Sequence, residues 1–194
     1  MYNIFMSTKN DATEMTEEEK KKKRREEDIQ WAISLVLAII IAFAIRAFVF
    51  TFVVVEQSSM YPTLKSEEHV ALSRVAYTFS KPRYGDIIVF ESVTDEGKSL
   101  VKRVIAVGGQ TIEIKNNVVY VDGKALDESS YIGENVVTSD YPLTYIPEGY
   151  VFVMGDNRGV SLDSRSFGPI NTDNIQGRVT FRLSPFTTFD EEND

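Results

Sequence analysis

The sequence contains no cysteine and only one histidine among its 194 residues. The absence of cysteine excludes disulfides, a thiolate nucleophile and cysteine-ligated metal sites. The single histidine, His69, is the only candidate base for a histidine-dependent catalytic triad. A serine nucleophile in this chain would therefore pass its proton either to His69 or to another kind of side chain.

The chain also lacks an excess of positive charge, since its formal net charge is −8. Nucleic acid is usually bound by a basic domain surface, so the composition argues against a nucleic-acid partner. The one basic block lies at residues 20–25, within an N-terminal stretch that is dominated by charge. Because residues 1–28 show no apolar periodicity, we predict that they form a disordered tail.

One long apolar run follows this charged stretch. Ile29–Phe48 spans about 20 residues, which is the length that crosses the hydrocarbon core of a bilayer as a helix. A buried helix of a soluble protein is the alternative, but such a helix should show a polar face, and this run shows none. We predict a transmembrane helix over residues 29–49 that anchors the chain in membrane lipid.

The flanking charges predict the orientation of this anchor. Basic residues close to a span stay in the cytoplasm, so residues 20–25 indicate a cytoplasmic N-terminus and an extracytoplasmic domain over residues 50–194. A cleaved secretory signal is the competing interpretation. The apolar run is longer than the core of such a signal, and no small-x-small cleavage site follows it promptly. The chain is therefore expected in the cell membrane as a single-pass protein.

The remainder of the sequence reads as short strands separated by turn residues. The segment after residue 46 is rich in aromatic and β-branched residues and is expected to be extended. Asn116-Asn117 and Asp122-Gly123 are typical of two-residue hairpin turns. The predicted fold is mainly β, an antiparallel sheet or barrel-like catalytic domain. Residues 127–147 and 157–174 are predicted as loops. The predicted strands are residues 69–76, 86–92, 100–107, 111–115, 118–122, 150–155 and 178–183.

The stretch QSSMYPTL, residues 57–64, places two adjacent serines just after the apolar run. Serines beside a turn-forming proline are common, so the pair alone does not establish a catalytic site. His69 lies in an alternating strand segment, where a lone histidine often has a structural role. These residues leave the nucleophile and its base open.

A lysine is the other kind of base, provided that its amine is neutral. At the ordinary pKa of about 10.4, only about four in ten thousand lysine side chains are neutral at pH 7. Burial among apolar groups lowers the pKa by destabilising the ammonium. Lys102 lies in the apolar strand segment SLVKRVIAV, whereas Lys98, Lys115 and Lys124 lie beside turns. An ordinary strand lysine with its amine in solvent is the alternative for Lys102.

Four segments in order resemble the motifs of the type I signal peptidases, the leader peptidases that remove signal peptides from exported proteins. They are SSMYPTL, YGDIIVF, VKRVIAVGGQTIEI and MGDNRGVSLDSRSFG, at residues 58–64, 84–90, 101–114 and 154–168. The resemblance covers most of the chain after residue 46. The single span resembles the Gram-positive form of the family.

The resemblance implies roles for individual residues. Ser59 corresponds to the nucleophile and Lys102 to the general base of a Ser-Lys dyad. Ser161 corresponds to a serine that hydrogen-bonds the lysine amine, and Asp163 and Arg165 correspond to an ion pair that braces the loop. Asp156, Asn157 and Arg158, in the same motif, read as structural turn residues, and Met60 either lines the site or fills the core.

One position departs from the family pattern. Two residues before the nucleophile the family usually has a small residue, often serine or glycine, that assists the oxyanion hole, and this chain has Gln57. The backbone N–H of Ser59 can still donate to an oxyanion, but the second donor is left open. Loss of one such donor typically costs about 10²- to 10³-fold in rate.

The resemblance implies a membrane-bound serine endopeptidase that needs no metal and no cofactor. Its expected partners are signal peptides of exported preproteins and membrane lipid, and contacts with the secretion machinery are left open. One alternative is an inactive or specialised membrane-tethered binding or assembly module with the same fold. Another is a self-cleaving Ser-Lys peptidase of the repressor type, which the anchor and the lack of a DNA-binding region oppose.

Overall fold

The structure, a computed structural model, describes residues 17–133, 136–183 and 186–188. The chain divides into two compact units, Met1–Arg46 and Ala47–Asp194. The elements of the described residues are α1 (Glu17–Val49), β1 (Phe50–Val54), η1 (Ser58–Met60), β2 (His69–Ser73), β3 (Ile87–Glu91), β4 (Ser99–Val107), β5 (Thr111–Lys115), β6 (Val118–Val121), β7 (Lys124–Ala125), β8 (Tyr141–Tyr145), β9 (Tyr150–Met154), α2 (Ser164–Phe167), β10 (Ile170–Asn171), η2 (Thr172–Asn174), β11 (Ile175–Leu183) and β12 (Phe186–Thr188).

Helix α1 begins well before the apolar run. The predicted disordered tail, residues 1–28, lies partly outside the described residues, but residues 17–28 are helical, which differs from the prediction. Glutamate, lysine and arginine are good helix formers, and Lys20 pairs with Glu17 at 3.1 Å. Helix growth is cooperative, so a charged segment joined to an apolar helix extends it without a new nucleation step.

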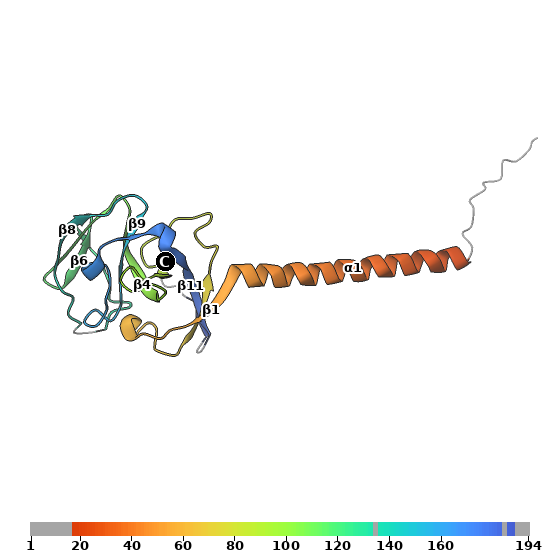
Figure 1. Ribbon diagram of the computed structural model, residues 1–194, viewed down its shortest axis with the longest axis horizontal. Coiled ribbons are helices and arrows are strands. Elements are labelled where there is room, and N and C mark those ends of the chain that lie inside the picture. The colour runs from red at the N-terminus through yellow and green to blue at the C-terminus, as the bar shows by residue number, and fades with distance from the viewer. Residues whose placement is uncertain (1–16, 134–135, 184–185, 189–194) are drawn as a thin grey trace, which may run out of the picture. The chain divides into compact units, whose positions relative to one another are not determined.

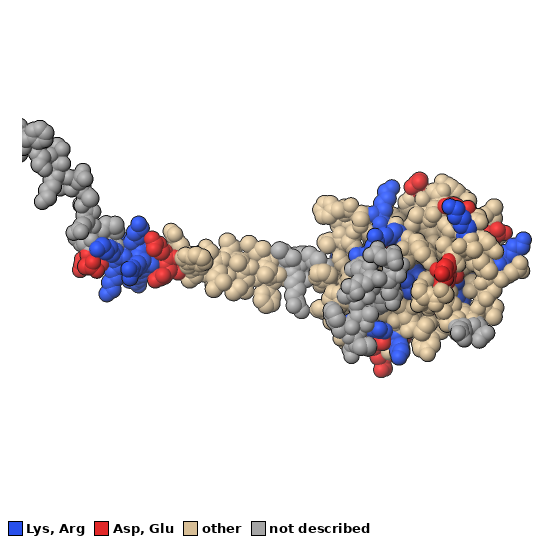
Figure 2. Space-filling model, turned by 180° about the vertical axis from the view of Figure 1, so that it is seen from behind, with Lys and Arg blue, Asp and Glu red and all other residues tan. Residues whose placement is uncertain are grey.

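Large apolar side chains of α1 are open to solvent in the structure, with Trp31 78% and Phe43 70% exposed. Figure 2 shows the basic residues of α1 gathered in one block, followed by a stretch of uncharged surface. The predicted membrane span falls within this helix. No helix in the part of the chain that the structure describes has the length and hydropathy of a membrane span.

The second unit is built from two antiparallel sheets, which confirms the predicted mainly β class (Figure 1). The larger sheet has eight strands in the order β1-β2-β11-β3-β4-β9-β10, with β12 paired to β11. The smaller sheet has the order β7-β6-β5-β8. In Figure 1, β4 and β9 lie between the smaller sheet and the strands β1 and β11.

All seven predicted strands are present, each within three residues of its predicted ends. Both hairpin predictions are also confirmed. Asn116 and Asn117 have φ of 52° and 68°, and Asp122 and Gly123 have φ of 51° and 75°, as two-residue hairpin turns require. Strand β8 was not predicted, since residues 127–147 were assigned to a loop. Its burial pattern is irregular and two of its five residues are half-buried, so it carries no clear alternation.

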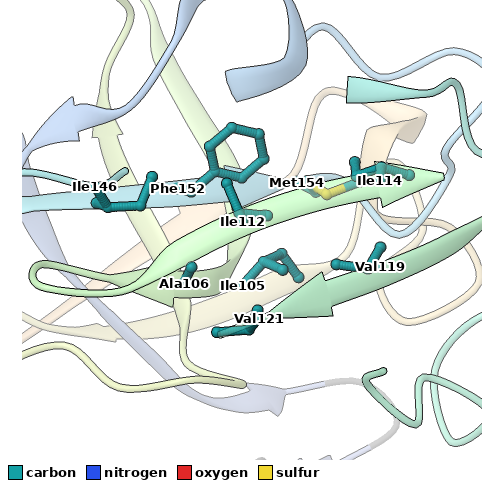
Figure 3. Packing of buried hydrophobic residues seen from close by; sticks show 9 residues of the cluster. All are labelled: Ile105, Ala106, Ile112, Ile114, Val119, Val121, Ile146, Phe152 and Met154. Atoms are coloured by element: carbon teal, nitrogen blue, oxygen red, sulfur yellow. The ribbon is translucent and has the colours of Figure 1, made fainter. Parts of the chain in front are cut away.

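The hydrophobic core joins the two sheets where β4 and β9 meet β5 and β6 (Figure 3). Gly108, between β4 and β5, lies so close to Pro147 and Glu148 that a Cβ atom there would meet their backbone. This close approach keeps the two sheets in contact. The buried members of this cluster are Ile105, Ala106, Ile112, Ile114, Val119, Val121, Ile146, Phe152 and Met154.

A second cluster fills the concave face of the larger sheet. Val53 in β1 and Val101 in β4 pack against the same buried group, although three strands separate β1 from β4 in the sheet order. The larger sheet therefore curls on itself, in the sense of the predicted barrel-like domain. Met60 and Leu64 also belong to this cluster and are fully buried. They attach the segment after β1 to the inside of the curled sheet.

Candidate active site

The two adjacent serines lie on one turn of 3₁₀-helix, Ser58–Met60, directly after β1. Ser58 is exposed, whereas Ser59 is 8% exposed. Met60 is the next residue, and its side chain is buried in the concave core. Because Met60 anchors the turn on the inside, Ser59 lies against the sheet and Ser58 faces away from it.

The loop after β9 holds this turn through hydrogen bonds to the backbone carbonyl oxygens of the turn. The backbone N–H of Asn157 donates to the carbonyl oxygen of Ser59 at 3.0 Å. The side-chain amide of Asn157 donates to the carbonyl oxygen of Ser58 at 3.1 Å. Gly155 allows this approach, because a Cβ atom at that position would overlap the Ser59 carbonyl oxygen and the Ser161 hydroxyl. Two residues of the MGDNRGVSLDSRSFG segment, Gly155 and Asn157, therefore hold the 3₁₀ turn that carries Ser59.

Lys102 lies in β4 and is 1% exposed. Its Nζ donates a hydrogen bond to Ser59 Oγ at 2.8 Å and another to the Val101 carbonyl oxygen at 3.0 Å. In β4 the residues on both sides of the strand are buried from Lys102 to Ala106, so the lysine is enclosed in the sheet. The alternative of a strand lysine with its amine in solvent is therefore wrong.

Burial lowers the pKa of Lys102 from 10.5 to about 8. The carboxylates of Asp163 and Asp156 act in the opposite direction, since each favours the ammonium form. At a pKa of about 8, roughly one lysine in ten is neutral at pH 7. The enclosed strand thus supplies a base that is accessible near neutral pH without a histidine.

The competing bases are all exposed, although Lys98 lines the same two cavities as Ser59. His69 is exposed at the start of β2, where its backbone pairs with Val54. Lys98, Lys115 and Lys124 are exposed, as their positions beside turns predicted. No hydrogen bond joins any of these four side chains to Ser59 in the residues that the structure covers. The geometry therefore favours Lys102 as the partner of Ser59.

Asp163 and Arg165 form the ion pair that the resemblance implied. Two parallel contacts of 2.8 Å join the guanidinium to the carboxylate. Asp163 is fully buried and also accepts a hydrogen bond from the backbone N–H of Gly155 at 3.0 Å. Arg165 donates to the carbonyl oxygen of Arg158 at 2.8 Å. The pair thus connects both ends of the loop that clamps Ser59.

Ser161 differs in detail from its predicted arrangement. Its hydroxyl is buried beside Gly155, but it forms no hydrogen bond with the residues that the structure describes. The hydrogen bonds of Lys102 Nζ go to Ser59 and Val101 instead. Its contact with Gly155 keeps Ser161 near the turn that carries Ser59. The predicted role of Ser161 in supporting the Lys102 amine stays a prediction.

The sequence did not single out Arg103, which directly follows the candidate base. The guanidinium of Arg103 binds Asp156 through two contacts, Nε to Oδ1 at 2.9 Å and Nη2 to Oδ2 at 2.8 Å. Thr63, just after the nucleophile turn, donates to Asp156 Oδ2 at 2.5 Å. The sequence does contain a signal for Arg103, because it is a cation in a strand that is apolar on both faces. Such a buried charge needs a buried partner of opposite charge.

Two cavities open beside Ser59, and Gln57 lines both. The first has a volume of about 280 Å³ and runs between β1 and the start of β4. The second has a volume of about 620 Å³ and extends to the exposed side chains of Val160 and Leu162. Gln57 is exposed and precedes the turn in an extended conformation. The site is thus accessible to a chain from two directions.

The chain is similar in sequence to known proteins over most of its length. Residues 28–184 match the family model described as signal peptidase, peptidase S26. Signal peptidase IB of Staphylococcus aureus (strain COL) is 38% identical over 179 residues, which cover 84% of this chain and 93% of that protein. A protein named probable signal peptidase I-1 from Synechocystis is 40% identical over 158 residues, covering 78% and 80%. A solved structure of a signal peptidase I from Enterococcus faecalis V583 is 33% identical, covers 52% of this chain and 98% of its own, and gives a TM-score of 0.45.

Proposed function

The chain belongs to the signal peptidase family, peptidase S26, and we propose that it is a membrane-bound endopeptidase in which Ser59 and Lys102 form the catalytic dyad. It removes signal peptides from preproteins. The main support for assigning Ser59 and Lys102 as nucleophile and base is the 2.8 Å contact between Lys102 Nζ and Ser59 Oγ inside the sheet. A buried amine held at hydrogen-bond distance from one hydroxyl has the geometry of a base and its nucleophile.

The first half of the reaction forms an ester. Neutral Lys102 accepts the proton of Ser59 while the hydroxyl oxygen attacks the carbonyl carbon of the scissile peptide bond. The resulting ammonium then gives that proton to the leaving nitrogen, so that the bond to the mature protein breaks as a free amine departs. The backbone N–H of Ser59 donates to the oxyanion, and Gln57 is the candidate for a second donor.

The second half of the reaction releases the signal peptide. A water molecule loses a proton to the Lys102 amine and attacks the ester carbon. The proton then returns to Ser59 Oγ as the ester bond breaks. One amine therefore serves both halves, and each half begins with Lys102 neutral.

The substrate is proposed to bind as an extended strand along β1. In the described part of the larger sheet β1 lies at one end of the strand order, so its outer edge is open to β-augmentation. Val53 and Val55 line the smaller cavity beside Ser59 together with Val89 and Val101. These four valines belong to the apolar part of a small cavity, and such a wall suits small side chains before the cleavage site.

The proposed location is the cell membrane, with a cytoplasmic N-terminus and an extracytoplasmic catalytic domain. The support is the sequence itself, in which the basic block at residues 20–25 precedes the apolar run Ile29–Phe48. A cysteine-free chain allows a direct test by single cysteines at two exposed lysines, Lys20 and Lys124. Lys124→Cys should react with a membrane-impermeant thiol reagent in intact cells, and Lys20→Cys only after permeabilisation. Equal labelling of both in intact cells would reject this orientation.

The catalytic assignment is tested by cleavage of a purified preprotein with the wild-type chain and four variants. Ser59→Ala and Lys102→Ala should lose cleavage by about 10⁴-fold or more. Ser58→Ala is the matched control, because it removes the neighbouring hydroxyl from the same turn, and it should cleave at nearly the wild-type rate. Normal cleavage by Lys102→Ala together with loss in His69→Ala would overturn the dyad. A wild-type chain that binds preprotein without cleaving it would instead indicate a binding module.

A further inference from the structure

Residues 128–131, between β7 and β8, contact both arginines that adjoin the dyad. Tyr131 is 8% exposed, and its ring lies under the Arg103 guanidinium at 3.9 Å from the ring centre. Glu128 pairs with Arg158 through two contacts, 2.6 Å and 3.1 Å. The sequence suggests no role for this segment, which lies outside the four segments of the family resemblance.

The two residues are also joined to each other. The hydroxyl of Tyr131 donates to Glu128 Oε1 at 2.7 Å. It lies 3.1 Å from the hydroxyl of Tyr84, which in turn donates to the carbonyl oxygen of Asp127 at 3.3 Å. Burial and the carboxylate of Glu128 raise the pKa of Tyr131, so its hydroxyl keeps its proton and remains a donor. Glu128 and Tyr131 therefore act as one hydrogen-bonded unit.

Each arginine leads directly to the reacting groups. Arg103 follows Lys102 in β4 and holds the Asp156 carboxylate in a two-point contact. Arg158 donates to the carbonyl oxygen of Gly155 at 3.1 Å, and Gly155 touches the Ser59 turn. Glu128 and Tyr131 are thus connected to Lys102 through Arg103 and to the Ser59 turn through Arg158 and Gly155.

We propose that Tyr131 and Glu128 are positioning residues for the Ser59–Lys102 dyad, acting through Arg103 and Arg158. This inference rests on the proposed function and extends it to a segment outside the resemblance. The aromatic face stabilises the buried Arg103 cation, and the carboxylate stabilises the buried Arg158 cation. Their joint effect is to keep Arg103 bound to Asp156 and Arg158 bound to Gly155, both in the loop after β9 that holds Ser59.

The arrangement has an electrostatic consequence at Lys102. The carboxylates that face its amine are Asp156 and Asp163, both from the loop after β9, and each favours the ammonium. Arg103 from β4 neutralises the first and Arg165 from α2 neutralises the second. If the Tyr131 ring is removed, water reaches Arg103 and weakens its hold on Asp156. The Asp156 charge then acts more strongly on Lys102, so the pKa of the amine rises.

The test compares Tyr131→Leu, Tyr131→Phe and Glu128→Gln with the wild-type chain in detergent. For Tyr131→Leu we expect kcat to fall about tenfold at pH 7 with little change in KM, which is the scale of a desolvated cation–π contact. The acidic limb of its kcat/KM profile should move to higher pH by roughly half a unit. Tyr131→Phe keeps the ring over Arg103 and should retain the wild-type limb. Glu128→Gln should lower kcat about threefold with a smaller shift of the limb than in Tyr131→Leu, because it removes the charge that faces the buried Arg158 but leaves the Tyr131 ring over Arg103.

The matched control is Tyr77→Leu. Tyr77 is partly buried, and its hydroxyl donates to the Asp86 carboxylate at 2.9 Å rather than contacting Arg103. A loss of packing alone would lower the melting temperature of both leucine variants without moving the acidic limb of either. A wild-type limb and kcat in folded Tyr131→Leu would overturn the proposal. If that variant does not fold, a wild-type kcat in Glu128→Gln would overturn it.

A second readout separates this inference from the proposed function. The titration of the Lys102 amine can be followed by NMR of chains labelled with ¹³C at lysine Cε, without any substrate. A higher pKa in Tyr131→Leu than in wild type supports the positioning role, and an unchanged pKa contradicts it. Failure of the proposed function would appear only in the cleavage assay, as a wild-type chain that does not cut preprotein.

Discussion

The two residues of the proposed dyad are held in opposite ways. Lys102 lies in the middle of a nine-residue strand and is paired with β3 through Ile88, so its own sheet fixes its position. Ser59 lies on a three-residue turn, and its carbonyl oxygen accepts from a residue nearly a hundred positions later in the chain. The base is therefore positioned by regular secondary structure, whereas the nucleophile is positioned by a distant loop.

This difference shows where each half is vulnerable. A strand lysine is insensitive to small loop changes but carries the energetic cost of burial. A serine on a short turn costs little to bury but depends on the hydrogen bonds from Asn157 and on the absence of a side chain at Gly155. Substitutions on the two sides should therefore separate activity from stability.

The largest effect is expected for Lys102→Met, which keeps most of the unbranched side chain and removes the amine. Cleavage should fall by about 10⁴-fold or more. Because burial lowers the pKa of Lys102 from 10.5 to about 8, the buried charge destabilises the folded state below pH 8, and this cost disappears as pH rises to 10.5. The variant should therefore gain up to about 3 kcal/mol in the free energy of unfolding at pH 7. Urea unfolding at pH 7 and pH 10.5 measures this gain, and a loss of stability at pH 7 would contradict it.

The next largest effect is expected on stability, when the buried ion pair between Arg103 and Asp156 is broken. Asp156→Asn removes the charge that faces the buried Arg103, which should cost about 3 kcal/mol in the free energy of unfolding. The matched control is Asp95→Asn, which breaks an exposed pair with Lys98 and should cost less than about 1 kcal/mol. Equal losses of unfolding free energy in the two variants would show that burial does not increase the contribution of an ion pair to stability.

The pH dependence of wild-type cleavage follows from the strand that buries Lys102. Only the neutral amine accepts the serine proton, and burial lowers its pKa to about 8. The value of kcat/KM should therefore rise about tenfold per pH unit below pH 8 and level off above it. Initial rates from pH 5 to 10 measure the profile. A limb centred near the histidine pKa of about 6.5 would point to His69 instead.

The smallest effect is expected on the nucleophile side. Asn157→Ala removes the amide that donates to Ser58 but keeps the backbone donor to Ser59, so kcat should fall about tenfold with KM nearly unchanged. Asn117→Ala is the control, since it removes an asparagine whose side chain donates to Val136 and which lies in the turn between β5 and β6 of the smaller sheet. It should cost more than about 1 kcal/mol of stability, because alanine also disfavours the positive φ at this position, without changing kcat. A Tm scan with steady-state kinetics separates the two outcomes.

The same contrast explains which features could be predicted from the sequence. Lys102 was found because its strand is apolar on both sides, and the hairpin at Asn116 and Asn117 because two such residues favour positive φ. Both signals are local. The contacts of Asn157 and Glu128 were not predicted, because each joins segments that are far apart in the chain and no periodicity records such pairings. Residues 17–28 were assigned to a disordered tail because their charge masked their helix propensity.

The burial of Lys102 makes this protease inert until it has folded. Its two reacting groups are 43 positions apart in the chain, and the Lys102 ammonium loses its proton near neutral pH only inside the completed sheet. In an unfolded chain the amine has its ordinary pKa of about 10.4 and is almost entirely protonated. With the proposed dyad, an unfolded copy therefore cannot cut neighbouring chains, and completion of the sheet is the step that makes the base available.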